Sequence, residues 1–369
     1  MRRPGETYRF DNFGGSSLCR SGGSNLRRWS FHCFLCWMVL LSCKKNPYPD
    51  QSLGNELVVL AEISAGDSLN VPVSKSIQVG SGGIISFEKV NSASVKIFRP
   101  DGKSYTLRLN TSPDYSTDPA SIYTAPSRPH SNTVYNLQVQ DPLSGTVTAQ
   151  TTLPSPVRVT RMDTSSEGRY GTDILHCKIT LVDTPDAQHY YVFEALKQLV
   201  TLDHYFLWKG KRYDYDQPAG KKSYATLKDS PGVLLLLDTI PRNVFQRLNI
   251  FTDDGNVDNA QVSVLDSPFR RIFLPGSYFA GSSYTTSVSI DRKYFRATQP
   301  ASLGWVVIQV KSVSPELYHY LFWYEKYKTD VGSVPTSQLY SPPGNIQNGL
   351  GIFGGSSKRQ WIFCFDDLR

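Results

Sequence analysis

The sequence lacks the long apolar run of a protein that crosses a membrane with a helix. No stretch reaches about 18 uninterrupted apolar residues, the minimum for such a helix. Only 19% of the 369 residues are charged while 40% are hydrophobic, which excludes a disordered polar chain. Three methionines stand against 18 Phe and 21 Tyr, a balance that favours strands over helical bundles. The composition predicts a β-rich protein with room for two domains.

The sequence also lacks a Lys/Arg run of the kind that binds nucleic acid. The formal net charge is +7, but six of the 39 basic and two of the 32 acidic residues lie within residues 1–42. The rest of the chain carries 33 basic and 30 acidic residues, a net charge of only +3. We therefore expect no nucleic-acid partner.

The amino end resembles a bacterial lipoprotein signal. Residues 27–43 read RRWSFHCFLCWMVLLSC, which is a pair of arginines, a short apolar run and a small residue before Cys43. In such signals the peptidase cuts before the cysteine, which then receives the lipid. We predict an export signal over residues 1–42 and lipid attachment at Cys43; the alternative is a buried apolar segment with an incidental cysteine. Residues 1–26 fit no part of such a signal, which indicates a start codon assigned too far upstream or an unusually long first region.

The segment after Cys43 is predicted to be a tether, and few cysteines follow it. Residues 43–56 are polar and contain two prolines, as expected of an extended linker between lipid and fold. Of six cysteines, only Cys177 and Cys364 lie beyond Cys43. In an oxidising compartment these two are candidates for a disulfide, and two free buried thiols are the alternative.

Short strands separated by turn residues predict the fold. Residues 57–153 contain strand patterns at roughly ten-residue spacing without an intervening helix, including a hairpin over 93–109, which predicts an immunoglobulin-like β-sandwich. The prolines near residue 154 indicate a stiff joint. Residues 154–369 predict a second, larger antiparallel β-sandwich or partly closed barrel. Its first expected strand is ILHCKITLVD. Further strands are expected at the start of 189–199 and at 233–237, 248–252, 285–290 and 305–310.

One helix is predicted near the carboxyl end, over residues 315–328. Ser314 supplies an N-cap, Pro315 the first helical position and Glu316 an acid in the first turn. Its aromatic stripe is more typical of packing on a sheet than of a ligand platform.

No catalytic, metal or cofactor motif is present. The sequence has no G-x-S-x-G elbow, no H-E-x-x-H or H-x-H spacing and no phosphate loop. Residues 254–259 (DGNVDN) place oxygen side chains at positions one, three and five of a calcium-type loop, but glycine and glutamate are missing at positions six and twelve, so a turn is favoured. Several aromatic residues are candidates for sugar stacking or a protein interface, although covering a sheet is their more common role: Tyr190, Tyr191, Tyr205, Trp208, Tyr213 and Tyr215. We expect no enzymatic activity, no cofactor and no metal.

The closing stretch resembles a known family. Ser314 to Tyr327 followed by PPGNIQNGLGIFGGSS at 342–357 is similar to the carboxyl-terminal signature of a Bacteroidota lipoprotein family, the domain of unknown function 4249. The AEISAGD, TTLP and paired-tyrosine segments agree with it, whereas Pro275 replaces an acidic residue that the family commonly has between Phe273 and Gly281.

The resemblance implies a location and a partner rather than a reaction. It implies an outer-membrane lipoprotein that accompanies a TonB-dependent receptor as a non-enzymatic accessory or ligand-capture protein; the alternative is a structural or protein-interaction lipoprotein of the cell envelope. Lys44 and Lys45 stand where surface-export signals have acidic residues, so we favour attachment facing the periplasm over the cell surface. The sequence predicts neither the ligand nor the oligomeric state.

Overall fold

The computed structural model describes residues 55–363 of the 369-residue chain, apart from 80–83, 113–117, 170–171, 186–188, 260–268, 296–304 and 331–341. The predicted export signal, Cys43, most of the tether and Cys364 lie outside the described residues. The described residues all belong to the second of the two units into which the chain divides, Leu53–Arg369.

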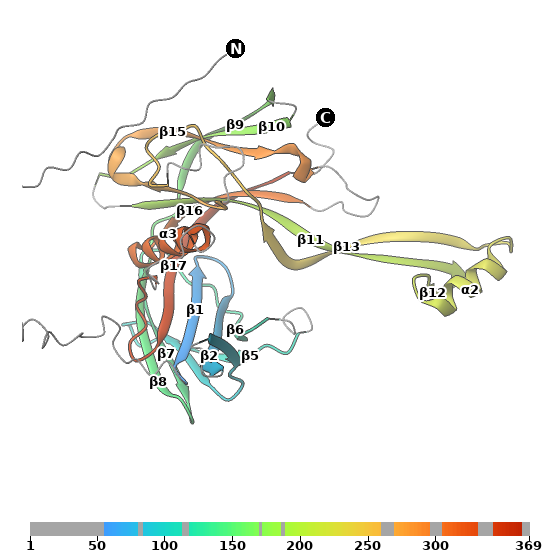
Figure 1. The fold of residues 1–369 in the computed structure, drawn as a ribbon, viewed down its shortest axis with the longest axis horizontal. Helices are drawn as coiled ribbons and strands as arrows, with labels where there is room; N and C mark the ends of the chain where they lie inside the picture. Colours follow the sequence, from blue (N-terminus) through green and yellow to red (C-terminus); the bar gives the residue numbers. More distant parts are fainter. Residues whose placement is uncertain are drawn as a thin grey trace, which may run out of the picture. The chain divides into compact units, whose positions relative to one another are not determined.

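The second unit is mainly β, as predicted. Strands account for 57% of the structure, and the described residues contain two α-helices and no closed barrel. The strands fall into a 14-stranded sheet and a 3-stranded sheet, the larger of which continues through the whole unit (Figure 1). The described part of the chain has no helix long and apolar enough to cross a membrane.

Eight strands form the first region, a sandwich around one apolar core. They are β1 Leu57–Ser64, β2 Leu69–Val79, β3 Ile84–Lys89, β4 Ser94–Phe98, β5 Ser104–Leu109, β6 Ser121–Ala125, β7 Thr133–Asp141 and β8 Gly145–Leu153. The predicted hairpin is the β4–β5 pair. Alternate residues of β4 and β7 point inward, so that Val95, Ile97 and Leu137 are fully buried in this core.

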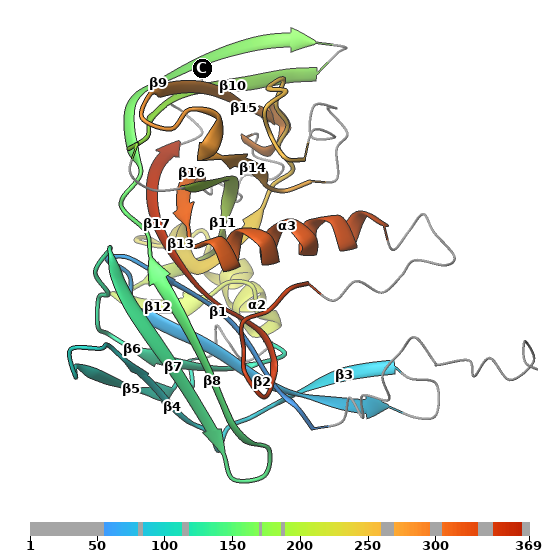
Figure 2. The same cartoon turned by 90° about the vertical axis from the view of Figure 1, so that its left-hand side faces the viewer.

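The last strand of the chain joins the first region to the second. β17 (Leu350–Phe363) pairs in parallel with β1 through its first half and antiparallel with β16 (Val306–Val313) through its second half. Figure 2 shows β17 running from its place beside β1 in the first region to its place beside β16 in the second. A parallel partner more than 250 residues away is not visible in local sequence patterns. The predicted division into residues 57–153 and 154–369 stays a prediction.

The second region is also a sandwich. One layer contains β16, β17, β11 (Tyr190–Trp208), β13 (Leu234–Arg247) and β14 (Ile272–Pro275). The other contains β9 (Arg158–Arg169), β10 (Thr172–Val182) and β15 (Ser283–Asp291). The core between them includes Cys177, Phe193 and Ile308. The strand expected at 248–252 is wrong: only Phe251 makes an isolated bridge, to Ser289.

The predicted helix covers the opposite face of the β11–β16 layer. It is α3, Pro315–Asp330, and it buries Leu317, Tyr318 and Leu321 against Val192 and Phe273. Its aromatic residues therefore pack on a sheet, as expected. Gly354 permits this packing, because a Cβ there would lie 2.6 Å from the Cβ of Leu317.

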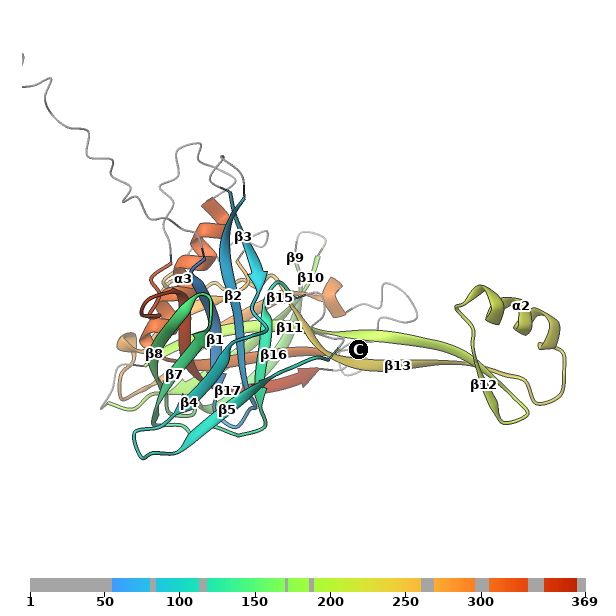
Figure 3. The same ribbon diagram turned by 90° about the horizontal axis from the view of Figure 1, so that it is seen from below.

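A two-stranded arm extends from the second region (Figures 1 and 3). β11 runs past the end of its pairing with β16 and continues only with β13 until it reaches β12 (Lys211–Asp214). The short helix α2 (Pro218–Leu227) packs on the end of the arm, where Phe206 contacts Tyr213 and Tyr224 with ring centroids 5.0 and 5.4 Å apart. The sequence predicted neither the arm nor α2.

Candidate ligand-binding groove

A groove lies on the same face of the β13–β11–β16–β17–β1 sheet as α3, over the part that α3 does not cover. Its volume is about 470 Å³, and its walls come from alternate residues of these five strands. The other face of the same strands carries the buried core of the second region. Strand pairing fixes which of these side chains stand next to each other, and two lining residues lie just outside the strands: Asp67 in the β1–β2 turn and Trp305 immediately before β16.

One end of the groove is apolar and exposed. Gln198 pairs with Phe245 across β11 and β13, and its backbone N–H donates to the backbone carbonyl of Trp305 on the other side. Phe245 is 46% exposed, Trp305 42% and Ile362 59%, which is unusual for large apolar side chains on one surface. Ordinary strand spacing places Phe245 and Trp305 about 10 Å apart, on either side of the glutamine.

A row of amides crosses the middle of the groove. Gln360 donates from Nε2 to Oε1 of Gln309 over 2.8 Å, and Gln309 donates to Oε2 of Glu194 over 2.6 Å. Register explains the row, because Glu194, Gln309 and Gln360 stand directly opposite one another on β11, β16 and β17. Gln309 is buried while Gln360 remains exposed.

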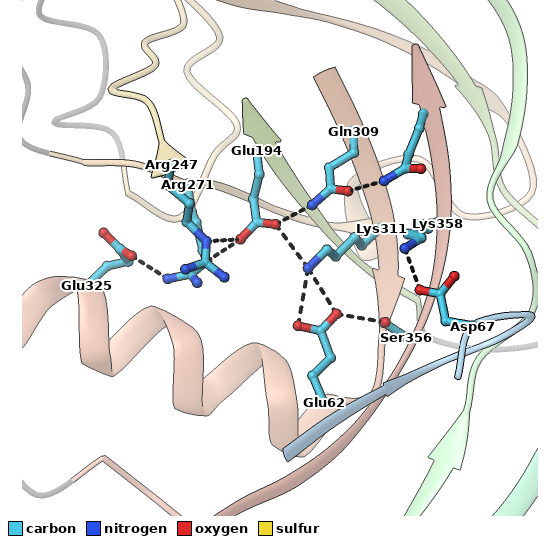
Figure 4. A network of polar contacts seen from close by, with 11 residues as sticks. Glu62, Asp67, Glu194, Arg247, Arg271, Gln309, Lys311, Glu325, Ser356 and Lys358 are labelled. Carbon is cyan, nitrogen blue, oxygen red and sulfur yellow. Dashed lines mark hydrogen bonds and ion pairs between the residues drawn. The ribbon is translucent and has the colours of Figure 1, made fainter. Parts of the chain in front are cut away.

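Charged side chains form the inner end of the groove, and their network of contacts extends to α3 (Figure 4). Lys311 bridges Glu194 and Glu62, with Nζ 2.9 Å from a carboxylate oxygen of each. Ser356 donates to Glu62 over 2.7 Å. Glu194 also receives Arg247 at 2.9 Å and Arg271 at 2.6 Å. Two further pairs extend this network: Arg271 with Glu325 of α3, and Lys358 with Asp67.

The network keeps its members ionised. Burial alone would raise the pKa of the Glu194 carboxyl, but Lys311, Arg271 and Arg247 outweigh burial and hold that pKa well below its usual range. Burial would likewise lower the pKa of Lys311, yet the carboxylates of Glu194 and Glu62 raise it. Within the lining of the groove, three acidic residues face three basic ones: Glu62, Asp67 and Glu194 against Arg247, Lys311 and Lys358.

The charges of the lining are paired with one another. Every charged group there has an opposite charge within ion-pair distance. An exposed apolar end and a polar end offer a surface for a ligand with both characters.

A second pocket, of about 330 Å³, lies beside residues 155–158 where the chain enters the second region. Asp183 there accepts a hydrogen bond from the Tyr191 hydroxyl at 2.9 Å, and His189 Nδ1 lies 2.6 Å from the same carboxylate oxygen. That histidine contact is too poorly aligned to count as a hydrogen bond. The buried Ser312 Oγ has no hydrogen-bond partner, so serine, histidine and aspartate are not connected as a hydrolase triad requires.

The structure places the candidates of the sequence in three separate locations. Tyr190 packs against α3, and Tyr191 donates a hydrogen bond to Asp183. The other four aromatic candidates, Tyr205, Trp208, Tyr213 and Tyr215, lie together at the end of the arm. None of the six lines the groove. Asp254, the first residue of the calcium-type loop, accepts hydrogen bonds from the hydroxyls of Tyr284 and Thr286.

Of the predicted cysteine pair, the structure describes only Cys177. Cys177 is fully buried and has no disulfide partner among the described residues, and burial raises the pKa of its thiol to about 12. Because Cys364 lies outside the described residues, the pairing stays untested, as does lipid attachment at Cys43.

The sequence analysis missed the groove, although one signal was present. Gln309 and Lys311 interrupt an otherwise apolar strand, VVIQVKSV, all of whose residues are buried. A lysine at a buried strand position requires a carboxylate nearby. Glu62 in LVVLAEIS and Glu194 in YYVFEAL are equally out of place in apolar strands. Matching these polar interruptions would have predicted the network.

The fold is a double β-sandwich with a groove on the sheet that its two regions share. The sequence of residues 46–361 matches the family described as "Domain of unknown function (DUF4249)", and the chain belongs to that family. The comparison with curated proteins gives no match. One solved structure found by comparison, described as manganese lipoxygenase of Gaeumannomyces graminis and partial zonadhesin of Komagataella pastoris, is 8% identical over 85% of this chain and 95% of that chain, with a TM-score of 0.15. A likeness this low carries no argument about fold or function.

Proposed function

We propose that this protein is a lipid-anchored, non-enzymatic protein of the outer membrane that captures a ligand for a TonB-dependent receptor. The single observation that carries ligand capture is the groove, in which Phe245, Trp305 and Ile362 are exposed beside a fully paired polar network. Exposing three large apolar side chains on one surface is costly unless a partner covers them.

The anchor and the receptor rest on the sequence. The signal-like residues 27–43 and the tether support attachment through Cys43, with the periplasmic side of the membrane favoured. A tether of about a dozen residues spans roughly 20 Å as a flexible chain. Two proteins held on one membrane meet at high effective concentration, so a modest interface suffices for a handover.

The arm favours the alternative, a structural or protein-interaction lipoprotein of the envelope. Leu234, Leu235 and Leu237 of β13 are 53%, 38% and 45% exposed at its end. A two-stranded ribbon with exposed leucines is marginally stable alone, and contact with another protein would stabilise it.

Crosslinking in intact cells tests both possibilities. The tagged full-length protein is purified from membranes, and the proteins and small molecules recovered with it are identified by mass spectrometry. We expect a TonB-dependent receptor and a bound small molecule; the Phe245→Ala/Trp305→Ala variant should keep the receptor and lose the small molecule. Cys43→Ala should lose membrane retention and lipid labelling. Recovery of other envelope proteins without a receptor would favour the alternative.

A further inference from the structure

We propose that the groove binds a neutral oligosaccharide, with a sugar ring stacked on Trp305. The inference rests on the proposed function, because it names the class of ligand that the same groove captures.

Charge is the first argument. The lining contains equal numbers of acidic and basic residues, and each is paired: Lys311 with Glu62 and Glu194, Arg247 with Glu194, and Lys358 with Asp67. A charged ligand would have to compete with these ion pairs or would add an unpaired charge to the groove. A neutral ligand leaves the pairs intact.

The mixture of hydrogen-bonding groups is the second argument. Arg247, Lys358 and Gln360 are donors at the accessible edge of the groove, while Glu62 and Asp67 are acceptors. Ser64 adds a buried hydroxyl on the groove wall that has no hydrogen-bond partner. Hydroxyl groups both donate and accept, so a polyhydroxylated ligand can use both kinds of side chain.

The position of the aromatic residues is the third argument. A sugar ring has an apolar C–H face and a rim of hydroxyls, and the groove has exposed aromatic rings next to polar side chains. Because Phe245 and Trp305 flank Gln198 across neighbouring strands, a ligand extending from one ring to the other passes over an amide. An open groove of this length suits a chain of sugars better than a single ring.

The location on a sheet face argues against a peptide. Extended peptides commonly bind by adding a strand to an exposed sheet edge, where backbone groups are unpaired. In the groove, β11 and β16 have paired strands on both sides, so side chains must supply the hydrogen bonds. The ligand therefore needs polar groups along its own length that match side chains.

Binding of defined probes to the full-length protein tests the proposal. The probes are neutral cello-, malto-, xylo- and manno-oligosaccharides, an anionic oligogalacturonate, a nucleoside and a neutral peptide, measured by titration calorimetry. We expect at least one neutral oligosaccharide to bind with little dependence on salt. Trp305→Ala should weaken it at least tenfold, Trp305→Phe much less, and Gln360→Ala severalfold.

Trp323→Ala is the matched control, because Trp323 on α3 is exposed to a similar degree, 37%, but lies outside the groove lining. It should leave binding unchanged. Failure of every neutral oligosaccharide, or binding that survives Trp305→Ala, overturns the inference. If the wild-type protein instead retains a peptide, nucleoside or anion that Trp305→Ala loses, ligand capture stands and the oligosaccharide does not.

Discussion

Two clusters of charged side chains are buried in this protein, and they differ in how completely their polar atoms are paired. Both oxygens of Glu194 are engaged, one by Arg247 and Arg271 and the other by Gln309 and Lys311. In the second cluster, one oxygen of Asp183 receives three contacts while its other oxygen has no hydrogen-bond partner.

The Glu194 cluster is a structural joint between distant strands, whereas the Asp183 cluster belongs to a less constrained pocket. The Glu194 cluster connects strands that are far apart in the sequence, β1, β11, β16 and β17, together with α3. Removing Glu194 leaves the buried Arg271 and Lys311 with fewer opposite charges. The Asp183 cluster connects Asp183 mainly to residues within eight positions of it, so its loss exposes fewer uncompensated groups.

Glu194→Ala should have the largest effect. The change leaves Arg271 and Lys311 buried with fewer opposite charges, and breaking a buried ion pair from one side costs about 3–5 kcal/mol. The free energy of unfolding in urea measures this loss. Glu88→Ala, which breaks the exposed pair with Lys75, is the control and should change stability by less than about 1 kcal/mol. Equal effects of the two changes would show that the network is not a joint.

Acid should have the second-largest effect, because it removes the stabilisation that ionised Glu194 provides. The pKa of Glu194 in the folded protein lies well below the 4.5 of an unperturbed glutamate, so the unfolded chain binds more protons than the folded protein as pH falls below about that value. The stabilisation is therefore present above pH 4.5 and is lost as pH falls toward the folded pKa. Urea unfolding as a function of pH should show a steeper acid loss in the wild type than in Glu194→Gln. Parallel pH profiles would contradict the assignment.

Sequence predicted the layers but not their connection. Alternation in segments such as SVKIF and the capping residues of α3 are local, and they sufficed for the sandwiches and the helix. The pairing of β17 with β1 and the groove depend on contacts across hundreds of residues, so no local pattern contains them. The segment 248–252 shows the opposite failure: its apolar residues are buried, but by packing against a core rather than in a strand.

Asp183→Asn should destabilise the protein less than Glu194→Ala. The asparagine keeps an acceptor for Tyr191 and Thr184, and only the contact with the His189 ring is altered, so we expect a loss of about 1–2 kcal/mol. Tyr191→Phe, which removes one hydrogen bond to Asp183, should cost about 1 kcal/mol. Urea unfolding of both variants ranks the two clusters. A loss from Asp183→Asn that matches Glu194→Ala would remove the distinction between them.

Adding a reductant should leave the free energy of unfolding unchanged. Cys177 belongs to the same apolar core as Tyr191, beside the second cluster, and has no disulfide partner among the described residues. Burial raises its pKa to about 12, so at neutral pH it should react with iodoacetamide only after unfolding. A disulfide to Cys364 would close a long loop and stabilise the fold by about 3–5 kcal/mol, which reduction would abolish. Mass spectrometry of unreduced protein that is denatured and alkylated decides between two thiols and a disulfide. Two alkylated cysteines, together with unchanged urea unfolding in reductant, are the expected result, whereas a mass that shows no alkylation until reductant is added would establish the bond.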